Sequence, residues 1–330
     1  MSFLLHSSTN TSPTDLLIIG AGPVGLHAAF YAGLRGLSVR LLEAQPEIGG
    51  QLSALYPDKV VYDWPGLPAI RAAEIVAALA AQLAPFNPEF RFGEVAQQLT
   101  QTPQGWTVTT QKDSYPARAL IVAAGLGALL PRGVQLSGVH PDVRTLPPDP
   151  QTLEGQRVLI VGGVPQAVEA ALKLSASGAR VSLTHRRALF RGSPAQLAQL
   201  QSLRESGQLH IYAPAELSRL DATGAWLDRG DEPQHVAAAT VVVLNGHLPE
   251  LTPLQSWPLG WQGEYIPADA AQRTVLPGVF VAGDLSLAGG DFKLLSVGLA
   301  QAALAANHAV HFVRPDQKAK PGHSSDRRLP

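Results

Sequence analysis

Three glycines and one glutamate near the start of the chain have the types and spacing to bind phosphate and ribose groups. Gly20, Gly22 and Gly25 follow an apolar run at 16–19, and Glu43 ends a second apolar run about 20 residues further on. The first glycine allows a tight turn, the second lets the backbone approach a pyrophosphate, and the third lets a helix pack closely on a strand. The helix N-terminus attracts phosphates, and the carboxylate accepts hydrogen bonds from a ribose. The order of strand, glycines, helix, strand and acid therefore predicts a dinucleotide site.

A second unit of the same kind begins about 140 residues later. Gly162 and Gly163 follow the apolar run 158–161, and we expect a helix at 168–174 and a further strand at 180–184. The chain therefore holds two dinucleotide-binding folds. The first lies almost at the N-terminus, a position that favours FAD as its ligand.

Four basic residues follow the second of these later strands. They are His185, Arg186, Arg187 and, after a short gap, Arg191. Folds that bind NAD carry an acid at this position, whereas arginines there accept a 2′-phosphate in bidentate fashion and disfavour a bare ribose diol. The cluster therefore predicts NADP(H) in preference to NAD(H).

Composition excludes several other classes of protein. The 330 residues contain 45% hydrophobic and 15% charged side chains, and the net charge of −1 gives no reason to expect nucleic acid or a membrane surface as a partner. The chain has no cysteine, which excludes disulfides, Cys-ligated iron–sulfur clusters, thiolate zinc sites and dithiol active sites, and we expect no metal. Residues 1–14 do not resemble a secretory signal, and no apolar run is long enough to cross a bilayer, so the cytoplasm is the expected compartment.

The remaining pattern predicts how these elements are organised into domains. We expect a β-hairpin at 95–110, buried strands at 119–125, 241–246 and 278–284, and a helix at 294–313. The Pro-rich segment 141–150 is interpreted as a linker, and the polar tail 314–330 has the composition of a disordered segment. The predicted fold is α/β, with two Rossmann-like domains, the second inserted into the first. The predicted bounds are 1–120 with 247–330 for the FAD-binding domain and 121–246 for the NADP(H)-binding domain.

This order of motifs resembles the flavoprotein reductases of the thioredoxin reductase type, over nearly the whole chain. The missing Cys-x-x-Cys sets thioredoxin reduction aside. The run 49–59, Gly-Gly-Gln-Leu-Ser-Ala-Leu-Tyr-Pro-Asp-Lys, is more similar to the thioredoxin-reductase-like ferredoxin/flavodoxin–NADP⁺ reductases. Phe280 to Asp284 resembles the second FAD motif, and the run from Pro321 to Ser325 resembles a C-terminal extension that reaches the flavin of a partner subunit.

The resemblance implies a role for particular residues. Tyr56 would stack on one face of the isoalloxazine, and His323 of a partner subunit would stack on the other, beside a hydrogen-bonding Ser325. Asp284 would hold the ribityl chain. Further FAD contacts are implied at Glu43, Gln51, Ala96 and Leu129. No side chain is expected to act as acid, base or nucleophile, because the cofactor carries the chemistry.

The implied activity is electron transfer between NADPH and a small acidic carrier, ferredoxin or flavodoxin, by a homodimeric FAD enzyme. One departure keeps alternatives open: Val164-Pro165 stands where the family has a third glycine and usually an acid. A branched side chain there crowds the approach to a pyrophosphate, whereas proline is well tolerated in a first helical turn. The alternatives are a related flavoprotein that takes electrons from another donor, and a flavin redox sensor without enzymatic activity.

Overall fold

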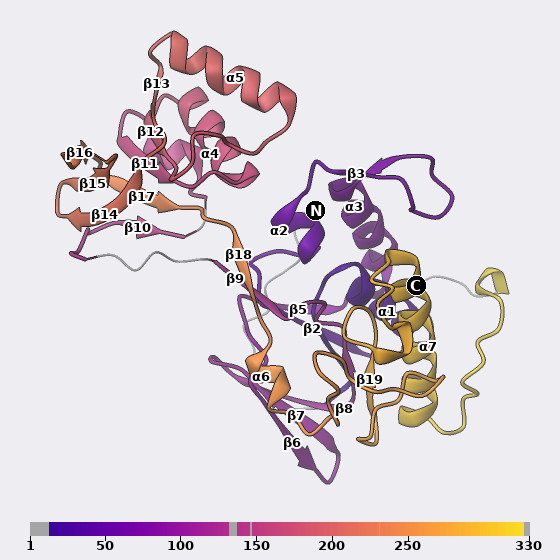
Figure 1. Ribbon diagram of the computed structural model, residues 1–330. Helices are drawn as coiled ribbons and strands as arrows, with labels where there is room; N and C mark the ends of the chain where they lie inside the picture. Colours follow the sequence, from indigo (N-terminus) through magenta and orange to yellow (C-terminus); the bar gives the residue numbers. More distant parts are fainter. Residues whose placement is uncertain (1–12, 132–136, 146, 231, 327–330) are drawn as a thin grey trace. The chain divides into compact units, whose positions relative to one another are not determined.

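The computed structural model describes residues 13–131, 137–145, 147–230 and 232–326. The chain forms two compact units, the first comprising Met1–Leu130 and Pro249–Pro330 and the second Pro131–Leu248. The second unit is therefore inserted into the first, and each unit has its own sheet and its own core (Figure 1).

The first unit is built on a seven-stranded sheet of order β5-β2-β1-β8-β7-β6, with β19 pairing with β8. Five of these strands run parallel, whereas β6 and β7 form an antiparallel hairpin that pairs with β8. The strands are β1 (Thr14–Ile19), β2 (Val39–Glu43), β5 (Glu89–Phe92), β6 (Gln98–Thr102), β7 (Gly105–Thr109), β8 (Ser114–Val122) and β19 (Val279–Val281).

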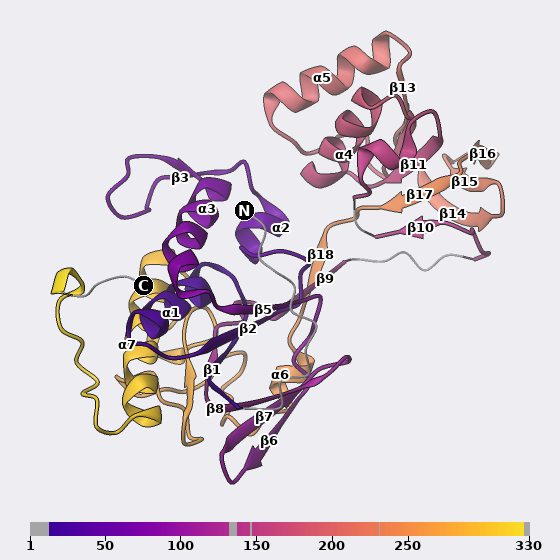
Figure 2. The same ribbon diagram turned by 180° about the vertical axis from the view of Figure 1, so that it is seen from behind.

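Both faces of this sheet are buried, which is typical of parallel strands. Leu16 and Ile18 of β1 contribute to the core that three helices cover, α1 (Pro23–Leu34), α3 (Ala72–Leu83) and α7 (Leu295–Val313). Leu17 and Ile19, which point to the opposite face, join a second core with residues of β7 and β8 and the segment around Trp257. Figure 2 shows α1, α3 and α7 together on one side of the strands.

The second unit repeats the arrangement with a five-stranded parallel sheet of order β10-β17-β11-β12-β13. Helices α4 (Pro165–Ala176) and α5 (Pro194–Glu205) supply the core on one face, and an antiparallel sheet of β14, β15 and β16 supplies the other. The strands are β10 (Val143–Arg144), β11 (Arg157–Val161), β12 (Arg180–Thr184), β13 (Leu209–Tyr212), β14 (Glu216–Asp221), β15 (Gly224–Asp228), β16 (Gln234–Ala237) and β17 (Thr240–Val243).

The limits of the units differ from the predicted domain bounds. A boundary after residue 120 falls inside β8, which pairs with β1 from Thr14↔Ala117 to Ile19↔Val122. A strand in the centre of a sheet cannot be shared between two domains, so the first unit continues to Leu130. The chain passes between the units through a two-stranded sheet of β9 (Ala128–Pro131) and β18 (His247–Glu250).

The segment 141–150 is not a linker. It contains β10, which pairs in parallel with β17 inside the second unit, and it leads into a short 3₁₀ helix at Pro150–Leu153. Composition predicted a loop because of its prolines, but pairing with the neighbouring strand decided the structure.

The tail contradicts the prediction of disorder as far as Ala319, where it is bound to the rest of the first unit. Arg35 on the C-terminal side of α1 donates hydrogen bonds to the carbonyl oxygens of Lys318 (2.6 Å) and Ala319 (3.3 Å), and also to Asn307 Oδ1 (2.6 Å). A buried cation that binds backbone carbonyls holds the segment in place, which composition alone cannot reveal. Residues 1–12 and 327–330 lie outside the described residues. Within the described part of the chain, no helix is both long and apolar enough to span a bilayer.

Candidate cofactor and nucleotide sites

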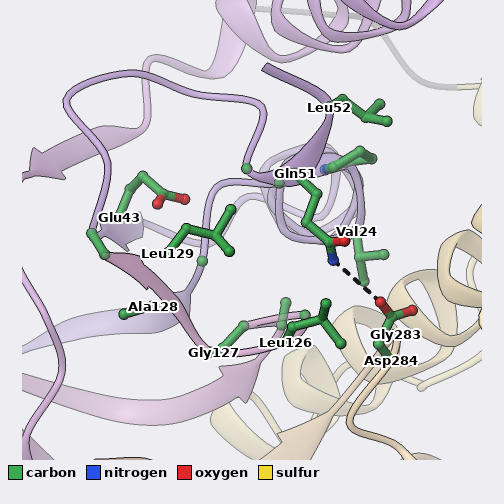
Figure 3. Close-up of a pocket in the computed structure, with 18 of the residues that line it drawn as sticks. Val24, Glu43, Gln51, Leu52, Leu126, Gly127, Ala128, Leu129, Gly283 and Asp284 are labelled. Atoms are coloured by element: carbon green, nitrogen blue, oxygen red, sulfur yellow. Dashed lines mark hydrogen bonds between the residues drawn. The ribbon is translucent and has the colours of Figure 1, made fainter. Parts of the chain in front are cut away.

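A cavity of about 630 Å³ lies within the first unit, beside the carboxyl ends of β1, β2, β8 and β19. This is the edge of a parallel sheet where ligands bind, and the volume is in the range of cofactor sites. It brings together residues that are far apart in sequence (Figure 3). The predicted FAD contacts that line it are Gly20, Gly22, Glu43, Gln51, Tyr56, Ala96, Leu129 and Asp284.

The glycine turn between β1 and α1 has three different structural requirements. Gly20 has φ +102°, and a Cβ built on it would overlap the carbonyl of Ala123. A Cβ on Gly25 would overlap the carbonyl oxygen of Gly20, so the absence of a side chain there allows α1 to pack closely against the turn, although Gly25 is not among the residues that line the cavity. A Cβ on Gly22 would meet no protein atom nearer than Gly50 Cα at 3.9 Å. Gly22 therefore keeps the space in front of the helix N-terminus open, where a pyrophosphate would be bound.

Glu43 is fixed at the end of β2 by backbone hydrogen bonds. Its side chain accepts from the N–H of Ala21 (2.8 Å) at Oε2 and from the N–H of Gln45 (2.9 Å) at Oε1. Only 7% of the residue is exposed, and burial raises the pKa of its carboxyl although these hydrogen bonds act in the opposite direction. Each carboxylate oxygen retains acceptor capacity, so the residue can accept hydrogen bonds from ribose hydroxyls at the cavity wall.

Three of the predicted flavin contacts lie together on another part of the cavity wall. Gln51 opens the short helix α2 (Gln51–Leu55), and its Nε2 donates to Asp284 Oδ2 at 3.3 Å (Figure 3). Tyr56 follows this helix and is half-buried. Burial, and then the charge of Asp284, raise the pKa of its hydroxyl, and its aromatic ring is of the kind that stacks on a flavin.

The residues of the cavity fit FAD. The open glycine turn matches a pyrophosphate, Glu43 matches a ribose, and Asp284 lies beside the aromatic ring of Tyr56 in the same cavity. When bound, FAD would supply the redox chemistry that the side chains of this cavity lack.

His323 and Ser325 lie away from this cavity. Both are exposed, and neither is among the residues that line it. Ser325 belongs to a 3₁₀ turn at Ser324–Asp326, on the extended tail seen in yellow in Figure 1. Their predicted contact with the flavin of a partner subunit stays a prediction.

Sequence reasoning missed several polar residues that line the cavity. Lys59 Nζ lies 5.3 Å from the centroid of the Tyr56 ring, and its place in the run 49–59 was the available signal. Glu94 is 7% exposed and accepts hydrogen bonds from the hydroxyls of Tyr115 (2.9 and 2.8 Å) and Thr110 (2.7 Å). Nothing in the sequence signals this carboxylate, because its partners come from β8 and from the turn before it.

The glycine loop of the second unit has the same local structure as that of the first, both at its first glycine and at the proline that begins its helix. The N–H of Gly20 donates to Leu42 O (2.8 Å), and that of Gly162 donates to Thr184 O (2.9 Å). Proline occupies the first position of both helices, since Pro23 begins α1 and Pro165 begins α4. Helix α4 begins earlier than the predicted range 168–174, because proline's fixed φ suits a first helical residue.

The basic segment, residues 185–191, follows β12, as predicted. His185 is partly buried, and its ring occupies the space that a Cβ on Gly163 would need. Burial and then the neighbouring arginines lower the pKa of its imidazole. The N–H of Arg191 donates to Gly163 O (2.9 Å), which ties the basic segment to the glycine loop.

The three arginines of this segment are available to a ligand. Arg186, Arg187 and Arg191 are exposed, and their side chains form no ion pair or hydrogen bond with another residue that the structure describes. Three guanidinium groups at the carboxyl end of a parallel strand suit a phosphate ester.

Comparison with known proteins assigns the chain to a family. Residues 14–309 match the pyridine nucleotide-disulphide oxidoreductase family. The chain is 40% identical to the ferredoxin--NADP reductase of Thermus thermophilus, over 96% of this chain and 98% of that protein. It is 36% identical to ferredoxin--NADP reductase 2 of Shouchella clausii, over 94% and 97% of the two chains.

Solved structures agree on the fold. Bacillithiol disulfide reductase from Staphylococcus aureus matches with a TM-score of 0.63 at 19% identity, over 90% of this chain and 98% of that one. Thioredoxin reductase from Lactococcus lactis matches with a TM-score of 0.57 at 22% identity, over 91% and 99%. The predicted two-domain α/β fold is thus confirmed, and the chain belongs to the pyridine nucleotide-disulphide oxidoreductase family, among its ferredoxin--NADP reductases.

Proposed function

We propose that this protein is an FAD-dependent oxidoreductase that transfers electrons between NADPH and a small carrier, ferredoxin or flavodoxin. The curated relatives with this activity in their names align over nearly the whole chain. The observation that carries the proposal is the cavity of the first unit, which combines an open glycine turn, a buried ribose-binding carboxylate and a tyrosine beside Asp284.

The side chains act by binding and positioning. Gly22 leaves room for a pyrophosphate, Glu43 accepts hydrogen bonds from ribose hydroxyls, and Asp284 holds the ribityl chain that leads to the flavin ring. In the second unit, Arg186 and Arg187 hold the 2′-phosphate that distinguishes NADPH from NADH. No residue of either site is assigned a role as acid, base or nucleophile, because the cofactor would supply the redox chemistry.

We further propose a cytoplasmic homodimer in which the tail of one chain covers the flavin of the other. The exposed position of His323 outside its own chain's cavity supports this arrangement. The cytoplasm is where NADPH and small electron carriers would meet the enzyme.

An anaerobic titration tests the proposed function. The purified protein should be yellow, and NADPH should bleach the flavin band at far lower concentration than NADH. Reduction by neither nucleotide would contradict the proposal. It would favour an electron donor other than NADPH, the second candidate, for which Val164 in the nucleotide loop is the supporting observation.

Truncation before Pro321, or the change His323→Ala, should alter the flavin absorption spectrum and the rate of NADPH oxidation. The free energy of unfolding should change little, because residues 322–325 are exposed and no residue of 321–325 belongs to a hydrophobic core of the described chain. The spectrum, the turnover rate and a thermal unfolding curve measure these effects. Lys320→Ala, an exposed change on the same tail, is the control. An unchanged spectrum and an unchanged rate in both tail variants would show that the tail does not reach a flavin.

A further inference from the structure

The two nucleotide loops of this chain can be compared position by position. Gly20 and Gly162 take equivalent backbone hydrogen bonds, and a Cβ on either would overlap a carbonyl at the end of a central strand, that of Ala123 or Leu244. By the same comparison, Val164 is the counterpart of Gly22, because each residue directly precedes the proline that begins its helix.

Gly22 and Val164 have opposite effects on the space in front of the helix that each precedes, α1 and α4 respectively. At Gly22 that space is open, with the nearest protein atom 3.9 Å from a built Cβ. At Val164 it holds a branched side chain, and Cγ1 lies 3.4 Å from a Cβ built on Gly246, just beyond β17. The valine also packs against the core of the second unit, which restricts its freedom to move aside. A dinucleotide crosses the sheet at this place, between the glycine loop and the next strand.

The ribose position shows a second difference. His185, which directly follows β12, is the counterpart of Glu43, which ends β2. Glu43 accepts a hydrogen bond from the N–H of Ala21, whereas the ring of His185 lies against Gly163. The second unit therefore lacks the carboxylate that would bind an unmodified ribose. The exposed arginines beyond it supply binding groups for a phosphate at the 2′ position instead.

We infer that the second unit binds its nucleotide chiefly through the 2′-phosphoadenosine end, and that Val164 sets this preference by occupying space that a pyrophosphate would use. The inference rests on the proposed function, since it concerns how the same protein recognises NADP(H). The ligands that the second unit would bind are therefore 2′-phosphorylated adenosine nucleotides. It also identifies Val164 as a specificity-determining residue that contributes no polar group.

Calorimetric titration of the FAD-loaded protein with NADP⁺ and with adenosine 2′-monophosphate tests the inference. The monophosphate has the 2′-phosphate but no pyrophosphate. In the wild type, NADP⁺ should bind no more than about tenfold tighter than the monophosphate, because the charge-assisted contacts are common to both. Val164→Gly should tighten NADP⁺ about tenfold or more and leave the monophosphate unchanged. Val139→Gly, at a position in the same unit that is 81% exposed, is the matched control and should change neither affinity.

Two results would overturn the inference. One is wild-type NADP⁺ binding several hundredfold tighter than the monophosphate, and the other is no gain for NADP⁺ in Val164→Gly. Flavin reduction by NADPH, measured separately, distinguishes this failure from failure of the proposed function. Rapid reduction without a gain in Val164→Gly refutes the role of Val164 alone. A gain in affinity without reduction by NADPH supports the role of Val164 and refutes NADPH as the electron donor.

Discussion

Gly22→Ala is expected to lower the affinity for FAD strongly while the protein without cofactor remains folded. The added methyl group would meet no protein atom nearer than 3.9 Å, so it projects into the space that the pyrophosphate needs. The backbone of Gly22, with φ −71°, is accessible to alanine, and the expected change in the free energy of unfolding is within about 1 kcal/mol. Loss of close backbone contact to a pyrophosphate should weaken FAD by about tenfold to a hundredfold. Fluorescence titration of the apoprotein with FAD, and urea unfolding without it, give the two quantities.

Gly25→Ala is the informative contrast. Its methyl group would overlap the carbonyl oxygen of Gly20, so α1 must move away from the turn. Overpacking of this kind costs about 1–3 kcal/mol, and the stability of the apoprotein should fall along with the affinity for FAD. If Gly22→Ala retained FAD as tightly as the wild type, the glycine turn would not be the pyrophosphate site.

Replacement of both Arg186 and Arg187 by alanine should weaken NADPH binding tenfold or more and scarcely affect NADH. Both side chains are exposed and lack a protein partner among the described residues, so their removal should leave the fold intact. Each charge-assisted contact with the 2′-phosphate contributes about 1.5–3 kcal/mol, and NADH has no such phosphate to lose. Dissociation constants for both nucleotides, taken at one ionic strength, give the comparison.

Arg204→Ala provides the matched control for charge. Arg204 is exposed on α5 in the same unit, away from the glycine loop in sequence and without an ion pair among residues of known position. Its loss should leave both dissociation constants unchanged. Equal weakening of NADPH and NADH by the double change at 186 and 187 would show that these arginines support the structure rather than select the nucleotide.

The local order of the two dinucleotide motifs could be predicted from the sequence because each is made of consecutive residues. An apolar strand, a glycine turn and the helix that follows depend on contacts within about 30 residues, as the βαβ unit requires. The ligand classes followed in the same way, since Glu43 and the arginines after β12 each stand at a fixed distance from their glycines. The same locality let Val164 be identified as a departure.

Long-range contacts determined the features that the sequence left open or misassigned. The limit of the first unit depends on pairing of β8 with β1, which lies about 100 residues away, so a boundary inferred from the order of the motifs fell inside a strand. The tail is held by Arg35, and Glu94 is held in the cavity wall by Tyr115 and Thr110; neither partnership leaves a local signal. The sequence by itself determined that there are two nucleotide-binding folds and what they bind. The tertiary structure decided how much room each position leaves, because the space beside Gly22 is bounded by Gly50 of the first unit and the space beside Val164 by Gly246 of the second, which lie far from them in the sequence.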